Sequence, residues 1–365
     1  MDFSVEQLRA DLHGLTPEEH GFTYLDVDRE PSGRGRLSGW VLSAKDLCDV
    51  RDMPTTLGNV DRTYYPEHSD AFIEALEKQG ARIIGKSSTP ELGLRVDTEP
   101  VGLPHPDNPL YPGCTPGGSS GGAAVQVARG LLRAAHASDG GGSIRVPAAA
   151  CGVVGFKPAG DELGVQGFIT RTVADNAFLH GHRMITPRAR IGLLVEPLFC
   201  DANVDAHHLR AAREAAQRLQ AAGFTVVPIS PYPQARATFA HFRTTFTSRL
   251  AGLNPAAGYA EWIAQQGRRV SSAELAAGLR ELQAQTGQAT GGIDELVAGV
   301  EKINQMAGMN ADKVAAVRAA LPVPAVATDA DAGESAPAGP TLAPVAAMLL
   351  AAMSVLGGTA LAAAA

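Results

Sequence analysis

Closely spaced cysteines are missing from this sequence. Its 365 residues contain four cysteines, and these lie far apart, at Cys48, Cys114, Cys151 and Cys200. Structural zinc sites and disulfide frameworks use cysteines in clusters or pairs. We therefore expect no metal site and no disulfide, and we interpret the four residues as buried reduced thiols of a cytoplasmic protein.

A block of basic residues is also absent. The chain has 31 lysines and arginines against 38 acidic residues, a formal net charge of −7, so we expect no nucleic-acid partner. The opening stretch MDFSVEQLRADLHG has early acids and no apolar core, so we do not expect it to be a secretory signal. With 45% apolar and 19% charged residues, the composition is that of a globular chain.

One long uncharged stretch, residues 341–365, has the length of a membrane span. Alanine, which gains little on transfer to lipid, supplies much of it, and Pro344 with the pair Gly357 and Gly358 interrupts it. We therefore expect no membrane association and interpret these residues as an apolar C-terminal core segment.

The order of local patterns predicts an α/β protein with a helical C-terminal portion. In the first half we expect a helix within 4–14, a buried strand ending at Lys45, a helix and short strand within 68–87, a loop over 98–122 and a helix over 123–135. In the second half we expect a β-α-β unit from strands at 190–196 and 224–229 around a helix at 205–222, then helices over 254–321.

Two short motifs match known signatures but lack the surroundings that those signatures need. Residues 80–87, GARIIGKS, fit the phosphate-binding loop pattern, yet the residues between the glycines form an apolar run typical of a strand. Residues 117–121, GGSSG, fit the nucleophile elbow of α/β-hydrolases, which requires a buried strand before it. The preceding PDNPLYPGCTP cannot be a central strand, so we interpret both matches as coincidental.

Two glycine-rich serine stretches are more informative. The stretch SDGGGSIRVPAAACG places three glycines directly before Ser143, and TPGGSSGGAAV places two before Ser119. Consecutive glycines leave backbone N–H groups uncovered and able to converge on an anion, which is the surrounding that acyl transfer to a serine requires. A flexible glycine turn would have the same local sequence, so the residues alone leave both readings open.

Five linked segments strongly resemble the amidase signature family: AKDLCDV, GKSSTPELG, PGGSSGGAA, DGGGSIRVPAAACGVVGFKP and GFITRTVAD. Their order and spacing match across residues 38–180. The resemblance implies a mixed β-sheet core with helices on both faces, in one amidase-type domain over residues 1–365. Within it we expect residues 38–180 to form the signature core, 254–321 a helical substrate-side region and 341–365 the C-terminal core segment.

The resemblance also implies a Ser–Ser–Lys triad. Ser143 matches the nucleophile, Ser119 the bridging serine after a cis Gly118–Ser119 peptide, and Lys45 the general base. Such a base must be neutral, and burial favours the neutral amine. Lys86 and Lys157 also follow apolar runs, so the residues alone do not choose among the three lysines.

Around the triad, the three glycines before Ser143 would stabilise the oxyanion through their N–H groups, namely Gly140, Gly141 and Gly142. By resemblance, Asp139 and Arg145 would form an ion pair that holds this loop.

Three functions follow from the resemblance. The first is hydrolysis of a small-molecule carboxamide without a cofactor. The second is the glutamine-hydrolysing subunit of a tRNA-dependent amidotransferase, and the third is a non-catalytic docking module on the same fold. The second half of the chain is shorter than is usual in the family, so a homodimer that covers an open sheet edge is an expected alternative.

Overall fold

A computed structural model provides the structure and describes residues 5–158, 164–182, 190–256 and 258–286. These residues divide into two compact units. The first unit holds residues 5–158 and 164–182, and the second holds residues 190–286 without residue 257. Whether they form one domain, as the sequence leads us to expect, remains a prediction.

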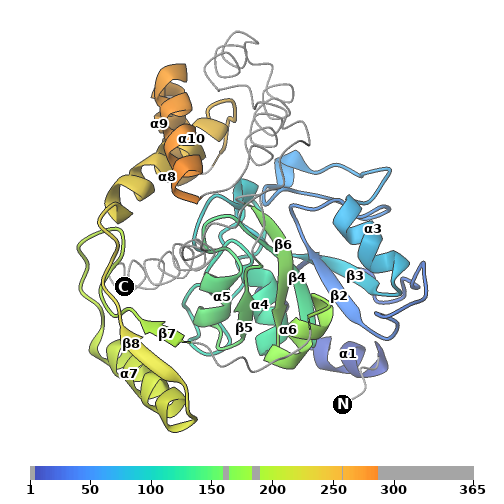
Figure 1. Ribbon diagram of the computed structural model, residues 1–365. Helices are drawn as coiled ribbons and strands as arrows, with labels where there is room; N and C mark the ends of the chain where they lie inside the picture. The colour runs from blue at the N-terminus through green and yellow to red at the C-terminus, as the bar shows by residue number, and fades with distance from the viewer. Residues whose placement is uncertain (1–4, 159–163, 183–189, 257, 287–365) are drawn as a thin grey trace, which may run out of the picture. The chain divides into compact units, whose positions relative to one another are not determined.

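The first unit combines short strands with short helices (Figure 1). Its elements are α1 (Val5–Leu12), α2 (Pro17–His20), β1 (Phe22–Leu25), β2 (Val41–Lys45), the 3₁₀ helix η1 (Val60–Arg62), α3 (Ala71–Lys78), β3 (Arg82–Ser87), η2 (Glu91–Gly93), α4 (Gly121–Ala128), β4 (Ala134–Asp139), α5 (Arg145–Ala150), β5 (Val154–Phe156), β6 (Val165–Thr170) and α6 (Val173–Leu179). The early helix and the strand that ends at Lys45 are therefore confirmed.

The strands form two sheets whose edges meet. One sheet has the order β1-β3-β2 and the other β4-β6-β5. Strand β2 runs parallel to β3, whereas β1–β3 and both pairs in the second sheet are antiparallel. The edge strands β2 and β4 lie side by side (Figure 1). The sheet arrangement is thus mixed, as expected.

Both faces of these strands carry a hydrophobic core. Neighbouring residues on a strand point to opposite faces, and here such neighbours fall into different clusters. Ile84 and Ile169 pack with residues of α1, α4 and α5, whereas Ile83 and Phe168 pack with residues of α3 and α6. Helices therefore cover both faces, which confirms the α/β class.

The helix expected over residues 123–135 is wrong in its second half. Helix α4 ends at Ala128, and Gly130 follows with a φ of +80°, a conformation that interrupts a helix. Residues Ala134–Asp139 then form β4, which pairs with β6 along its whole length. The alanines have high helix propensity, but strand pairing and burial override that preference.

Neither coincidental motif has the structure of its namesake. Residues 82–87 of the GARIIGKS segment form strand β3, so no phosphate-binding loop is present there. The residues before GGSSG, from 111 onward, contain no strand. Both expectations from the sequence are confirmed.

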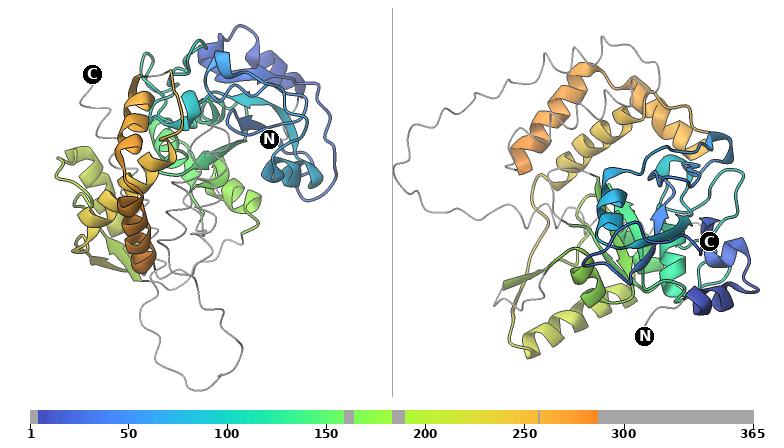
Figure 2. Two further views of the ribbon diagram at one scale, coloured as in Figure 1. Left: turned by 90° about the horizontal axis from the view of Figure 1, so that it is seen from above. Right: turned by 90° about the vertical axis from the view of Figure 1, so that its right-hand side faces the viewer.

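The second unit begins with the expected β-α-β unit. Strand β7 (Arg190–Leu193) and strand β8 (Thr225–Pro228) are parallel and joined through α7 (Ala206–Ala221). Three helices follow and pack together (Figure 2), namely α8 (Ala235–Arg249), α9 (Gly258–Arg269) and α10 (Ser272–Thr286). Ser271 and Glu274 form the expected reciprocal cap before α10.

Helix α8 was not anticipated from the sequence, whereas α9 and α10 fall in the helical region expected over 254–321. The rest of that region, and the segment at 341–365, lie outside the described residues. Among the helices that are described, none has the length and apolar character needed to cross a bilayer.

Candidate active site

The structure brings two of the predicted residues into direct contact. Lys45 is the last residue of β2, and its Nζ lies 2.7 Å from Oγ of Ser119. Both residues are 1% exposed. The peptide bond between Gly118 and Ser119 is cis, as the resemblance implies. A lysine and a serine that are 74 positions apart thus form a buried hydrogen bond.

The surroundings of Lys45 favour a neutral amine. Burial lowers its pKa to about 7, against the opposing influence of Cys48 and Asp139. Within the described ranges, no carboxylate lies within the 4.0 Å ion-pair distance of its Nζ. The Cys48 thiol stays neutral as well, because burial raises its pKa to about 12. Lys45 therefore has the character of a base.

Ser143 lies on the loop between β4 and α5, next to the contact of Lys45 and Ser119. The N–H of Ser120 donates to the carbonyl oxygen of Ser143 at 3.2 Å, which joins the two serine loops. Ser143 is half-buried, whereas Ser119 is buried. Of the two, Ser143 is thus the more accessible to a substrate.

A carboxylate organises the glycine loop from inside. Asp139, at the end of β4, accepts hydrogen bonds from the N–H groups of Gly142 (2.7 Å) and Ile144 (3.1 Å). It also accepts from Nε of Arg145 at 2.9 Å, which forms the expected ion pair. Burial alone would raise the pKa of Asp139, but Arg145, Lys157 and the Gly142 N–H hold it below its ordinary value.

This arrangement corrects the expectation for Gly142. Its N–H is already bound to Asp139, so it is not free to meet an oxyanion. The N–H groups of Gly140 and Gly141 have no acceptor in the part of the chain that the structure describes. A Cβ on Gly140 would meet no heavy atom within 4 Å. Open space and a free donor therefore coincide at Gly140, and Gly141 supplies a second free donor beside it.

The other two candidate lysines have structural partners. Lys86, on β3, forms an ion pair with Asp46 at 3.0 Å, and both side chains are 0% exposed. Asp46 also accepts a hydrogen bond from the backbone N–H of Thr56 at 3.2 Å, so Lys86 and the backbone are among its partners, and Lys45 is not. Lys157 donates to the carbonyl oxygen of Gly140 at 2.8 Å, and burial lowers its pKa to about 8. Of the three candidate lysines, Lys45 is therefore the one whose amine makes a hydrogen bond with one of the two predicted catalytic serines.

Three residues around Lys45 do not follow from the sequence patterns. The carbonyl oxygen and Oγ of Ser138 lie 3.5 Å and 3.2 Å from its Nζ. His136 accepts a hydrogen bond from the backbone N–H of Lys45, and Gln166 contacts the other ring nitrogen of His136. A histidine within an alanine-rich buried strand was the available signal.

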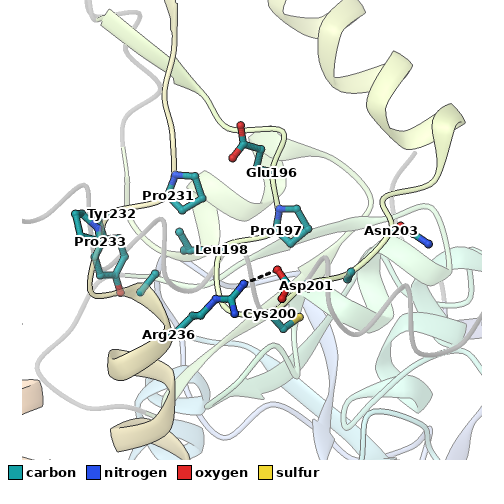
Figure 3. A pocket seen from close by; sticks show the side chains of 12 residues that line it. Glu196, Pro197, Leu198, Cys200, Asp201, Asn203, Pro231, Tyr232, Pro233 and Arg236 are labelled. Carbon is teal, nitrogen blue, oxygen red and sulfur yellow. Dashed lines mark hydrogen bonds and ion pairs between the residues drawn. The ribbon is translucent and has the colours of Figure 1, made fainter.

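The second unit contains a hollow that the predicted catalytic residues do not line. An open hollow of about 590 Å³ in the second unit lies after the carboxyl ends of β7 and β8, and residues 196–198, 200–203, 231–233, 235 and 236 line it (Figure 3). Its Arg236 pairs with Asp201. None of the predicted catalytic residues lines it. Across the described residues, no group of three or more histidine, cysteine or acidic side chains could hold a metal. Cys48 and Cys151 are buried as expected, whereas Cys114 is exposed, so the expectation of a buried thiol is wrong there.

Comparison with known proteins agrees with this geometry. Residues 23–182 match a family model described as Amidase. This region belongs to the amidase signature family. It contains Lys45, Ser119 and Ser143, together with all of the glycine loop.

Two curated relatives illustrate the range of amidase signature proteins. The glutamyl-tRNA(Gln) amidotransferase A subunit of Methanospirillum hungatei is 38% identical over 159 residues, which cover 43% of this chain and 35% of the relative. The indoleacetamide hydrolase of Pantoea agglomerans pv. gypsophilae is 35% identical over 217 residues, covering 53% and 47%. The chain thus spans less than half the length of either relative.

Solved amidase-signature structures share the fold. A 6-aminohexanoate cyclic dimer hydrolase superposes with a TM-score of 0.65 at 23% identity, covering 83% of this chain and 73% of the other. A bacterial aryl acylamidase gives a TM-score of 0.61 at 21% identity, covering 82% and 74%. At these identities the likeness shows the fold and not the substrate.

Proposed function

We propose that this protein hydrolyses a carboxamide C–N bond through an acyl-enzyme intermediate, with Ser143 as nucleophile, Ser119 as proton relay and Lys45 as general base. Oγ of Ser143 attacks the amide carbon while its proton passes to Ser119, whose own proton passes to the neutral Lys45. The C–N bond then breaks as the departing nitrogen takes up that proton. Water, activated by the same relay, releases the carboxylate and regenerates Ser143.

One observation carries this proposal. Lys45 is a fully buried amine that is bonded to Ser119 and has no carboxylate partner among the described residues. A buried lysine with a structural role usually has a counter-ion, as Lys86 does here. An amine that is kept neutral beside a hydroxyl is suited to accepting a proton.

The glycine loop supports the same reaction. As the tetrahedral intermediate forms, its oxygen becomes negatively charged, and the uncommitted N–H groups of Gly140 and Gly141 are the donors that would meet it. Lys157 holds the carbonyl of Gly140, and across a trans peptide this directs the N–H of Gly141 to the opposite side. The open space at Gly140 would admit the substrate carbonyl.

The substrate class is a small-molecule amide, as the name of the indoleacetamide hydrolase suggests for that relative. Similarity to amidotransferase A subunits makes glutamine a second candidate substrate. We also propose a cytoplasmic setting, since all four cysteines are free thiols. A homodimer is the assembly we would test first, by light scattering on the purified chain.

Active-site labelling tests the proposal directly. A fluorophosphonate should add once, on Ser143, and Ser143→Ala and Lys45→Met should both abolish the adduct in intact-mass spectra. Ser87→Ala is the matched control, because Ser87 is a buried serine whose hydroxyl makes one long bond of 3.5 Å to Ala44. Well-folded protein without any adduct would instead favour the docking module. Unlabelled protein from the same preparation would then be assayed on aliphatic, aromatic and amino-acid amides, glutamine included.

A further inference from the structure

The N–H of Lys45 cannot be satisfied within its own sheet. The N–H of the next residue, Asp46, donates to Ser87 on β3 at 3.0 Å. Successive N–H groups along a strand point to opposite sides, so the Lys45 N–H points away from β3, toward β4. Strands β2 and β4 belong to different sheets and form no ladder. A buried N–H in this position requires another acceptor.

His136 on β4 provides that acceptor. Its Nδ1 lies 3.1 Å from the backbone nitrogen of Lys45, and its Nε2 lies 2.9 Å from Oε1 of Gln166 on β6. A backbone N–H can only donate, so Nδ1 must be unprotonated and Nε2 must carry the proton. Burial lowers the pKa of His136 to about 4, in keeping with this neutral tautomer.

We propose that His136, as the neutral Nε2–H tautomer, is a positioning residue that fixes the end of β2 so that the Lys45 amine stays on Ser119. This inference rests on the proposed function. Strand β4 then holds Lys45 at two points, since Ser138, two residues after His136, contacts the amine itself. The same strand leads directly into Asp139 and the glycine loop, so it aligns both halves of the catalytic machinery.

Several groups surround the hydrogen bond between the Lys45 N–H and His136, and they determine the effect of losing it. The ring of Phe72 lies 5.4 Å from the imidazole, Lys86 acts on it electrostatically, and Cys48 and Asp139 act on the Lys45 amine. Among the described residues, the Lys45 N–H donates to Nδ1 of His136 and to none of these groups. Without His136, the end of β2 would loosen and admit water to the amine. The pKa of Lys45 would then rise toward that of a solvated lysine, and less of it would be neutral at pH 7.

Three substitutions of His136 distinguish its hydrogen bond to Lys45 from the simple filling of space. His136→Asn places an amide oxygen about where Nδ1 lies, His136→Gln places an amide about where Nε2 lies, and His136→Leu keeps neither. We expect Leu and Gln to lower kcat about tenfold, the equivalent of one lost hydrogen bond, and to move the acid limb of the pH profile upward. Asn should restore both. If all three lose activity alike, or the pH limb stays in place, His136 only fills space and the proposal is overturned.

The unmodified protein offers a test that does not depend on folding of the variants. Nitrogen-15 NMR of uniformly labelled protein should show His136 as the Nε2–H tautomer at pH 7, with the Lys45 amide strongly protected from exchange. An Nδ1–H tautomer would overturn the proposal. Labelling of Ser143 reports separately on the function, so a protein with the expected tautomer and no adduct would refute the catalysis and not the contact.

Discussion

Lys45 and Lys86 lie on neighbouring parallel strands, and both side chains are buried, yet their surroundings differ completely. Lys86 has a carboxylate partner, Asp46, and also donates to the carbonyl of Pro54 and the hydroxyl of Thr55. Lys45 has hydroxyls and a carbonyl around its amine, and its pKa falls to about 7. Burial alone therefore does not determine what a lysine does; the presence of a counter-ion does.

The two lysines also differ in what they cost the free energy of unfolding. An amine kept neutral in the interior lowers the stability of the fold at any pH where the unfolded chain would be protonated. A buried ion pair with further hydrogen bonds loses little by comparison. The region around Lys45 thus has the features of a reactive site, and the region around Lys86 those of a structural one.

The largest expected effect is on activity. Lys45→Met should lower kcat/KM by at least about 10⁴-fold, the scale seen when a member of a catalytic triad is removed. Lys78→Met is the control, since the Lys78 side chain is 75% exposed and pairs with Glu74. Rates on any amide that the parent hydrolyses would measure this. If Lys45→Met kept its activity, Lys45 would not be the general base, and it would be no more reactive than Lys86.

Lys86→Met should act on stability instead. Loss of the ammonium leaves Asp46 buried without its partner, which costs about 3–5 kcal/mol in comparable buried pairs. Urea unfolding would measure the change. The double variant with Asp46→Asn keeps an acceptor for the N–H of Thr56 and removes the unpaired charge, so it should recover most of the loss. Equal destabilisation by the single and double variants would show that the unpaired Asp46 carboxylate is not the cause of the lost stability.

The pH dependence of stability should reveal the neutral amine of Lys45. Its folded pKa of about 7 lies below that of an unfolded lysine, about 10.4. Between these values the unfolded state binds more protons, so the free energy of unfolding rises with pH by up to about 1.4 kcal/mol per unit. Lys45→Met removes this contribution. The variant should therefore gain most relative to the parent below pH 7, and the gain should shrink toward pH 10.

The same protonation step predicts the acid limb of the activity profile. The parent kcat/KM should rise with pH through an apparent pKa near 7, as Lys45 loses its proton. A parent-minus-variant stability difference that does not change with pH would contradict the assignment, and so would a flat activity profile between pH 5 and 9.

We expect the smallest effect at Lys157, whose carboxylate partner is more distant than that of Lys86, whereas Lys45 has none. Its Nζ lies 3.8 Å from Asp139 and donates to the Gly140 carbonyl, and its side chain is 4% exposed. Lys157→Met should loosen the glycine loop and lower kcat about tenfold, the equivalent of one charge-assisted hydrogen bond. KM should change less than kcat. Unchanged kcat would show that the loop needs no support from this side.

Several local features of the fold could be predicted from the sequence. The strand before Lys45, the helix and strand around Gly80 and the β-α-β unit of residues 190–229 all follow from hydrophobic periodicity and turn residues. Strand β4 could not be predicted in this way, because its alanines favour a helix and only pairing with β6 makes them extended. The linked motifs also selected Lys45 and Ser119, which the structure shows in contact.

The sequence by itself determined which residues could perform the chemistry and which short segments would become strands or helices, because these properties depend on neighbours along the chain. The tertiary structure decided which of three lysines is left without a carboxylate, that Gly142 donates to Asp139, and that His136 receives the N–H of Lys45 from 91 positions away. Such partners depend on strand register and on which edges meet. Both are set by packing between distant segments, and no local pattern encodes them.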